Sequence, residues 1–211
     1  MDTKTAVDSG RKTFKKRGIV VIGISGKIGS GKDYVKNYLG EYMNKQKKRW
    51  IAVAFAFPLK YQVATRLGVS IDVLNDRKDA ESRALLQAEG RRMREQEGSD
   101  AVVRHFAPMA ELMVQANEAR VLIVPDVRFP REVDWVRREG GIVIRLEAPA
   151  RTRAKLASEC NGNEADMLRN GSEVSETALD DTGFDLTLNN DPGNEHRFKD
   201  RLHSIMQFLL K

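Results

Sequence analysis

Apolar runs and amphipathic segments alternate along most of the chain. Mainly apolar runs have the pattern of strands buried on both faces, and they span 18–25, 50–57, 121–127, 142–147 and 184–188. Apolar side chains also return every three or four positions, which predicts helices over 32–44, 59–67, 100–117 and 130–139 and a last helix after Pro192-Gly193. This alternation predicts an α/β fold with a mostly parallel, five-stranded sheet flanked by helices.

Two segments contain too few apolar residues to contribute much to a core. They are a polar, helix-favouring stretch at about 70–100 and an Asn- and Gly-rich stretch at about 148–174. In parallel α/β sheets ligands bind at the carboxyl ends of the strands, and polar segments inserted there act as substrate arms and lids. We therefore expect one domain over 18–211, with a helical substrate-binding insert and a lid.

Composition excludes several classes of protein. The 211 residues contain one cysteine, Cys160, which excludes a disulfide framework and a multi-cysteine zinc or iron–sulfur site. Hydrophobic residues make up 41% of the chain, which rules out disorder throughout, and no apolar run is long enough to cross a membrane. The basic start and the apolar stretch after it imitate a signal peptide, but no cleavage pattern follows. We expect a cytoplasmic protein without membrane contacts.

The net positive charge is concentrated at the start of the chain. Residues 1–17 hold six Lys or Arg and two Asp, so they carry +4 of the total +6 and leave +2 for the remainder. A domain that grips nucleic acid would carry its charge on the folded body, so this distribution does not favour nucleic acid as a partner. We expect residues 1–17 to be a solvated, disordered basic leader.

A glycine–lysine motif lies between the first predicted strand and the first predicted helix. It fits the pattern G-x-x-x-x-G-K, and its residues are Gly26, Lys27, Ile28, Gly29, Ser30, Gly31 and Lys32. Glycines let successive backbone N–H groups point into one concavity, and the helix N-terminus adds partial positive charge. The motif therefore predicts a phosphate-binding loop in which Lys32 reaches the terminal phosphates. The alternative is a glycine-rich turn with an exposed lysine.

Acidic and basic candidates lie near this loop. Asp33 stands where the motif usually has Ser or Thr, so a carboxylate replaces the usual hydroxyl ligand of Mg²⁺ or caps the helix. Asp126 ends the third predicted strand, where an acid that orders Mg²⁺ or its waters belongs, and Arg128 can clamp a phosphate. The alternative is that Asp126 starts the next turn and that Arg128 is its local ion-pair partner.

The two polar segments are rich in cations. Segment 77–94 contains Arg77, Lys78, Arg83, Arg91, Arg92 and Arg94, and segment 151–155 contains Arg151, Arg153 and Lys155. Phosphoryl transfer needs positive charge over the transferring group and exclusion of water. We expect some of these side chains to close on phosphates, although for any single one of them a solvated helix face is the better interpretation.

Four stretches, in this order, resemble one family. SGKIGSGKD near the start, FPLK at 57–60, PDVRFPREVDWVRREGGIVIRLEAP at 125–149 and SETALDDTGFDLTLNN at 175–190 are similar to phage-type deoxynucleoside monophosphate kinases. The Gly-Lys-Asp ending of the loop is also similar to the related animal-type phosphomevalonate kinases. The resemblance spreads over most of the chain from residue 18 on, and it would place a phage-encoded protein in the host cytoplasm.

The resemblance implies transfer of the γ-phosphoryl group of ATP, with Mg²⁺, to a deoxynucleoside monophosphate. By it, residues 26–33 hold the ATP phosphates, and Lys32, Asp126 and Arg128 surround the transferring group. It assigns Lys60, Arg91, Arg92 and Arg128 to the acceptor and Arg151 and Arg153 to the lid, with Asp33 and Asp126 toward the metal. Ser175 and Glu176 match the family's Ser-Glu motif, which holds either the return path of the lid or an acceptor group.

Other readings of the residues stay open. Phosphomevalonate kinase, or another small-molecule kinase, would keep the loop, Asp126 and the lid, but would lack a pocket that stacks a base; Phe57 and Phe106 are available for stacking. A regulatory module that binds nucleotides without transfer, and that contacts nucleic acid through its leader, is the second alternative. The exposed insert is a candidate contact for a homodimer, and the sequence leaves the base and sugar of the acceptor open.

Overall fold

A computed structural model describes residues 13–76, 80–159, 174–191, 193 and 195–210. Its centre is a sheet of five parallel strands in the order β2-β3-β1-β4-β5. The strands are β1 (Val20–Gly26), β2 (Trp50–Ala52), β3 (Val121–Val127), β4 (Ile142–Glu147) and β5 (Leu186–Asn189). The predicted α/β class and the parallel five-stranded sheet are thus confirmed.

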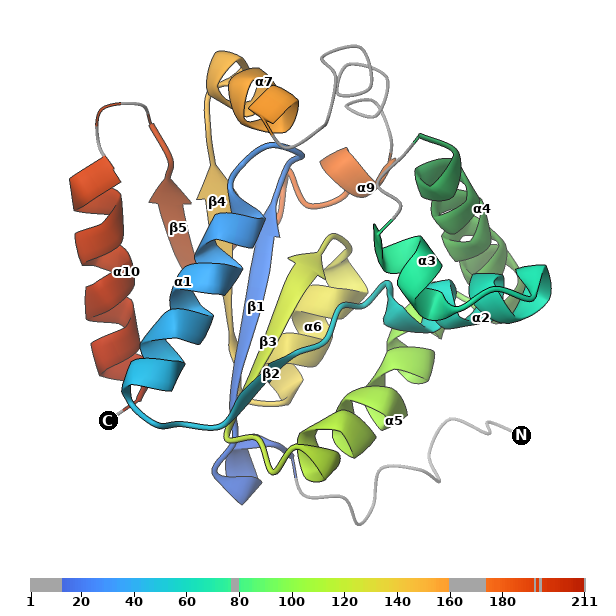
Figure 1. Ribbon diagram of the computed structural model, residues 1–211, viewed down its shortest axis with the longest axis horizontal. Coiled ribbons are helices and arrows are strands. Elements are labelled where there is room, and N and C mark those ends of the chain that lie inside the picture. The colour runs from blue at the N-terminus through green and yellow to red at the C-terminus, as the bar shows by residue number, and fades with distance from the viewer. Residues whose placement is uncertain (1–12, 77–79, 160–173, 192, 194, 211) are drawn as a thin grey trace.

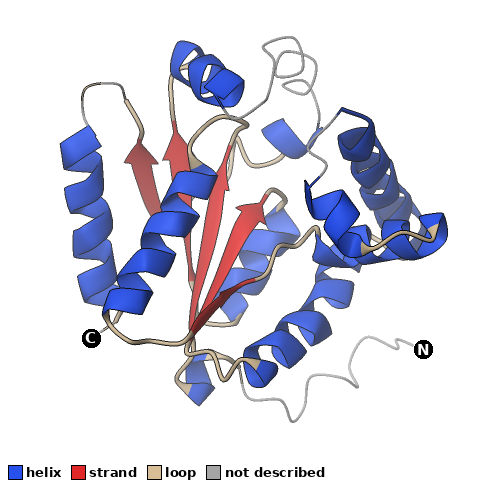
Figure 2. Cartoon of the chain, viewed as in Figure 1, coloured by secondary structure: helices blue, strands red, loops and turns tan. Residues whose placement is uncertain are grey.

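Helices cover both faces of this sheet (Figures 1 and 2). On one face α1 (Lys32–Lys45) and α10 (Glu195–Leu209) bury Leu39 and Leu202 against alternate strand residues such as Ile22 and Ile24. On the other face α5 (Ala101–Ala116) and α6 (Pro130–Arg138) pack against the intervening positions. Because both faces are covered, the strands read as nearly continuous apolar runs. Among the described helices, none is long and apolar enough to cross a membrane.

The second strand is shorter than predicted, and the helix after it begins earlier. β2 ends at Ala52, whereas a strand was expected to continue to Phe57 and stop at Pro58. Pro58 instead lies in the first turn of α2 (Phe57–Leu67), where its missing N–H costs no hydrogen bond. The intervening N–H groups of Phe55 and Ala56 bond to the carboxylate of Asp126 and not to a neighbouring strand.

A helical insert extends from the side of the sheet where β2 lies. It consists of α2, α3 (Ile71–Asp76) and α4 (Ala80–Glu97), which lie together on the right of Figure 1. A small apolar cluster, which includes Val63 and Leu74, holds α2 and α3 together. Beyond the carboxyl ends of the strands lie α7 (Ala150–Glu159) and the single turn α9 (Val174–Thr177).

Part of the basic leader belongs to the core. Phe14 precedes the short helix η1 (Lys15–Arg17), is 0% exposed and meets the ring of Trp135 edge to face at 6.1 Å. Its N–H donates to the carboxylate of Glu139 at 2.9 Å, and Arg17 pairs with Glu111. The expectation of a disordered leader over 1–17 is therefore wrong for 13–17, because one aromatic side chain gains more from burial than the short segment loses in freedom. Residues 1–12 lie outside the described residues.

Phe14→Ala should lower the free energy of unfolding by about 3 kcal/mol, because it leaves a cavity beside Trp135. Urea unfolding followed by tryptophan fluorescence measures the change. Phe208→Ala is the matched control, since that ring is 79% exposed and its loss should cost less than about 0.5 kcal/mol. Equal effects of the two substitutions would show that Phe14 does not belong to the core.

Candidate active site

The phosphate loop, residues 26–32, joins the end of β1 to the start of α1. Gly29 has a φ of +74°, and a Cβ at this position would overlap the carbonyl oxygen of Arg153 at the start of α7. Only glycine therefore lets the loop backbone and the α7 backbone approach this closely. The hydroxyl of Ser30 is buried without a hydrogen-bond partner among the described residues. An unsatisfied donor inside a glycine-rich loop suits a phosphate oxygen.

Lys32 folds back onto its own loop. Its Nζ donates to the carbonyl oxygens of Gly26 at 2.5 Å and Lys27 at 2.9 Å. Burial of the ammonium group and the nearby charge of Arg128 lower its pKa to about 7, while Glu176 and Asp33 act in the opposite direction. The protein thus holds a cation that lacks sufficient negative charge around it, and a bound polyphosphate would supply that charge.

Asp126 lies at the carboxyl end of β3, as predicted, and both of its oxygens are engaged. They accept the N–H groups of Phe55 at 2.6 Å and Ala56 at 2.9 Å. Burial raises the pKa of this carboxyl, whereas the two N–H groups, Arg128 and Lys60 lower it. Asp126 therefore fixes the turn from β2 into α2, and each oxygen keeps a lone pair that can reach a hydrated cation.

Arg128 pairs with Glu176 and not with Asp126. Its Nη1 donates to Glu176 Oε1 at 2.6 Å, and the other carboxylate oxygen accepts the N–H of Ile28 at 2.7 Å. The side chain of Glu176 is 4% exposed. One buried carboxylate from α9 therefore links the phosphate loop to the cation at the end of β3, which corrects the local-pair alternative.

Glu132 is a site residue that the sequence reasoning missed. Its carboxylate accepts the N–H groups of Arg128 at 2.6 Å and Phe129 at 3.0 Å and so caps α6. Burial and the charge of Asp126 raise its pKa to about 8. The signal was present as Pro130 followed by Glu132 at the third helical position, a helix-start pattern. Glu132 fixes the backbone from which Arg128 projects.

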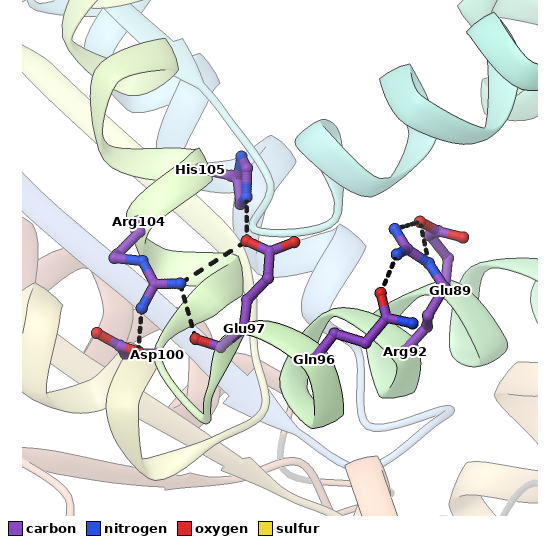
Figure 3. A network of polar contacts seen from close by, with 7 residues as sticks. All are labelled: Glu89, Arg92, Gln96, Glu97, Asp100, Arg104 and His105. Carbon is purple, nitrogen blue, oxygen red and sulfur yellow. Dashed lines mark hydrogen bonds and ion pairs between the residues drawn. The ribbon is translucent and has the colours of Figure 1, made fainter.

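The insert directs two of its arginines differently. Arg94 stacks at 4.1 Å over the ring of Phe129, the residue that follows Arg128 in the sequence, and burial lowers the pKa of Arg94. Arg92, which the resemblance assigned to the acceptor, is held along α4 by Glu89 at 2.5 Å and Gln96 at 2.5 Å (Figure 3). The sequence counted Arg94 among the arm cations without singling it out, because nothing local to α4 reveals the distant Phe129.

The remaining predicted residues lie around this centre. Lys60 on α2 is close enough to Asp126 to affect its pKa, and Arg91 is exposed on α4. Arg151 is exposed and Arg153 is half-buried on α7, and Ser175 precedes Glu176 in α9. Asp33 is 78% exposed at the start of α1, with Lys36 at 3.7 Å.

The carboxylates near the phosphate loop suit Mg²⁺ better than they suit a metal ion whose ligands all come from the protein. Among the described residues, no three His, Cys, Asp or Glu side chains gather as metal ligands do. Mg²⁺ usually takes one or two carboxylates and completes its shell with phosphates and water. Asp126, with a free lone pair on each oxygen, and Asp33, beside the loop, fit such a role.

Comparisons with known proteins give a family match and a shared fold. A family model described as phosphomevalonate kinase matches residues 24–141, more than half of the chain, from the phosphate loop through α6. TT1252 from Thermus thermophilus is 16% identical, with a TM-score of 0.57 over 90% of this chain and 98% of that one, which shows a shared fold. Shikimate kinase from Bacteroides thetaiotaomicron is 15% identical over 89% and 98% of the two chains, but its TM-score of 0.42 is too low to carry a conclusion. No curated protein matches by sequence.

The lowered pKa of Lys32 makes stability depend on pH. The unfolded lysine keeps its proton up to about pH 10.5, while the folded one releases it from about pH 7, so the unfolding free energy rises with pH between these values. At pH 6.5 Lys32→Met should be more stable than the wild type, because it no longer buries a charged ammonium group. The difference in unfolding free energy should shrink by up to about 1 kcal/mol per pH unit above pH 7.

Urea unfolding at pH 6.5 to 9 measures this advantage in ligand-free protein. Lys36→Met, one turn further along the same helix, is the matched control, and its difference from the wild type should stay constant across the series. A constant difference for Lys32→Met as well would contradict the lowered pKa.

Proposed function

The chain belongs to the phosphomevalonate kinase family, and from this premise we propose that it transfers the γ-phosphoryl group of ATP to the phosphate of a deoxynucleoside monophosphate. Its family and fold make it a P-loop small-molecule kinase. The choice of acceptor within that class is our proposal. It rests on the charges around the site and on the motif resemblance.

The convergence of Lys32 and Arg128 is the observation that carries the proposal. β1 and β3 are paired neighbours, so the loop after β1 and Arg128 after β3 emerge side by side. The two cations are close enough that Arg128 lowers the pKa of Lys32. A transferring phosphoryl group carries charge on all its equatorial oxygens, and positioned cations stabilise that charge.

Further cations on the insert side favour an acceptor that carries its own phosphate. Arg94 lies over Phe129 next to Arg128, and Lys60 lies near Asp126. A phosphomonoester brings about two negative charges to these cations, whereas an alcohol acceptor brings none. Such an acceptor oxygen is already nucleophilic at neutral pH, so the reaction needs alignment and charge neutralisation more than a strong base.

We assign the remaining residues by their positions. The loop N–H groups and Ser30 hold the ATP phosphates, and Lys32 bridges toward the transferring group. Arg151 and Arg153 on α7 exclude water from that side. Mg²⁺, when bound, neutralises charge on the phosphates, and Asp126 and Asp33 are the carboxylates that we expect to hold it through water.

Phosphomevalonate is the second candidate acceptor, and the matching family model favours it. Both acceptors are phosphomonoesters, so the cations described above serve either one. A nucleoside needs a surface on which its base can stack. Phe106 cannot provide that surface, because it is 0% exposed in the core, whereas Tyr61 on α2 is 57% exposed. The four motifs in family order make the deoxynucleotide our first choice.

Lys32→Ala should lower kcat by orders of magnitude, because the transferring group loses its nearest cation. Arg128→Ala should cost at least about 2 kcal/mol in kcat/KM, the scale of a lost charge-assisted contact. Arg131→Ala is the matched control. Arg131 is exposed on α6, and its ion pair with Asp134 is exposed and long, at 3.7 Å. Steady-state kinetics test these expectations, on variants whose circular dichroism spectra match that of the wild type. Near-normal turnover of Lys32→Ala would remove Lys32 from the mechanism.

A coupled assay of ADP release with ATP and Mg²⁺ tests the substrate. The acceptors are the deoxynucleoside monophosphates, their ribose counterparts and phosphomevalonate. We expect turnover with at least one deoxynucleotide. Turnover with phosphomevalonate alone would show that the acceptor is wrong but the reaction class is right. No turnover with any acceptor would contradict the transfer reaction.

A further inference from the structure

The segment 175–180 holds the phosphate loop through two carboxylates. Glu176 Oε2 accepts the N–H of Ile28 at 2.7 Å, and Asp180 Oδ2 pairs with Nζ of Lys27 at 2.9 Å. Successive loop residues are thus held by acids four positions apart on a segment about 150 residues further along the chain. In Figure 1, α9 lies between the loop and the insert. We name this segment the loop clamp.

The backbone of the loop clamp is anchored independently of its acids. Leu179 lies between the two and is 3% exposed in the core cluster beneath α6. The backbone N–H groups of Ala178 and Asp180 also donate to the carbonyl oxygens of Val174 at 2.9 Å and Thr177 at 3.0 Å. Because the backbone is fixed, each carboxylate can impose a position on the group that it contacts.

Glu176 contributes most to this arrangement. Its side chain is 4% exposed, and each oxygen accepts one short bond, from the N–H of Ile28 and from Nη1 of Arg128. A buried carboxylate is costly unless it is paired, so these two bonds fix its orientation. The same bonds fix the guanidinium group of Arg128 relative to the loop.

The charge of Glu176 also lets two cations lie close together. Arg128 and Lys32 carry like charges, and the carboxylate of Glu176, whose Oε1 lies 2.6 Å from Nη1 of Arg128, offsets part of their repulsion. Without that carboxylate, Arg128 would gain by moving out toward solvent. A guanidinium group that is already in place loses less freedom when a phosphate binds.

We propose that Glu176 is a positioning residue, which aims Arg128 and fixes the first half of the phosphate loop without touching substrate. The inference rests on the proposed phosphoryl transfer, and it replaces the idea of Glu176 as an acceptor ligand. The competing interpretation is that the carboxylate occupies a phosphate subsite and leaves when nucleotide binds. Its burial and the anchored backbone favour positioning, because departure would break two charge-assisted bonds.

Glu176→Gln tests the proposal, because it keeps the shape and one oxygen but removes the charge. We expect kcat/KM for the acceptor to fall at least tenfold, with the KM for ATP within threefold of the wild type. Asp134→Asn, an exposed carboxylate on α6, is the matched control and should leave both unchanged. A loss below twofold in Glu176→Gln would overturn the proposal.

A double-mutant cycle shows whether Glu176 acts through Arg128. If it does, adding Glu176→Gln to Arg128→Ala should lower kcat/KM by less than a further twofold, since no guanidinium group remains to be aimed. Losses that multiply would overturn the proposal, because they would show that the two residues act separately.

A readout without turnover separates this inference from the proposed function. In ligand-free protein the side-chain N–H signal of Arg128, assigned by its loss in Arg128→Ala, should shift or broaden in Glu176→Gln but not in Asp134→Asn. We expect this change in the Arg128 signal even if no acceptor is phosphorylated. The absence of phosphorylation would contradict the proposed function but not the positioning role of Glu176. An unchanged Arg128 signal, together with at least tenfold tighter ADP binding in Glu176→Gln, would instead identify the carboxylate as a competing anion.

Discussion

The parallel pairing of β1 with β3 determines where the charged groups of the site lie. Its register runs from Val20 opposite Val121 to Ser25 opposite Val127, with one shift after Gly23. Both strands therefore end at the same edge, with the phosphate loop after one and Asp126 and Arg128 at the other. The apolar contacts that stabilise the sheet thus also bring together charges that would otherwise repel.

Buried and half-buried carboxylates hold the chain segments that leave this edge. Asp126 binds two N–H groups at the start of α2, Glu132 binds two at the start of α6, and Glu176 binds one in the loop. Loop N–H groups removed from water need partners, and a carboxylate can serve two of them at once. In the insert, Glu89 of α4 links that helix to α2 through its ion pair with Arg66, and it also pairs with Arg92 of its own helix.

Features encoded in short stretches could be predicted from the sequence, and features that depend on distant contacts could not. The strands, the phosphate loop and the positions of Asp126 and Arg128 follow from local patterns. The hydrogen bond from the N–H of Ile28 to Glu176 joins residues 148 apart, and Arg94 meets Phe129 from another element, so no spacing rule reveals either contact. The start of α2 was misplaced because the run 50–57 is apolar throughout, and only the bonds from Asp126 show where the strand ends.

The packing of Phe14 moves the boundary of the folded unit. The pattern of charges places that boundary at Gly18, just before the first strand. The core, however, includes the ring of Phe14, four residues earlier. A truncated protein that began at Gly18 would retain every strand and every charged group of the site, yet it would fold around a void lined by Trp135 and its neighbours. Because the truncation also removes the backbone that carries this ring, the void would open to solvent and leave an apolar patch on the far side of the sheet from α1.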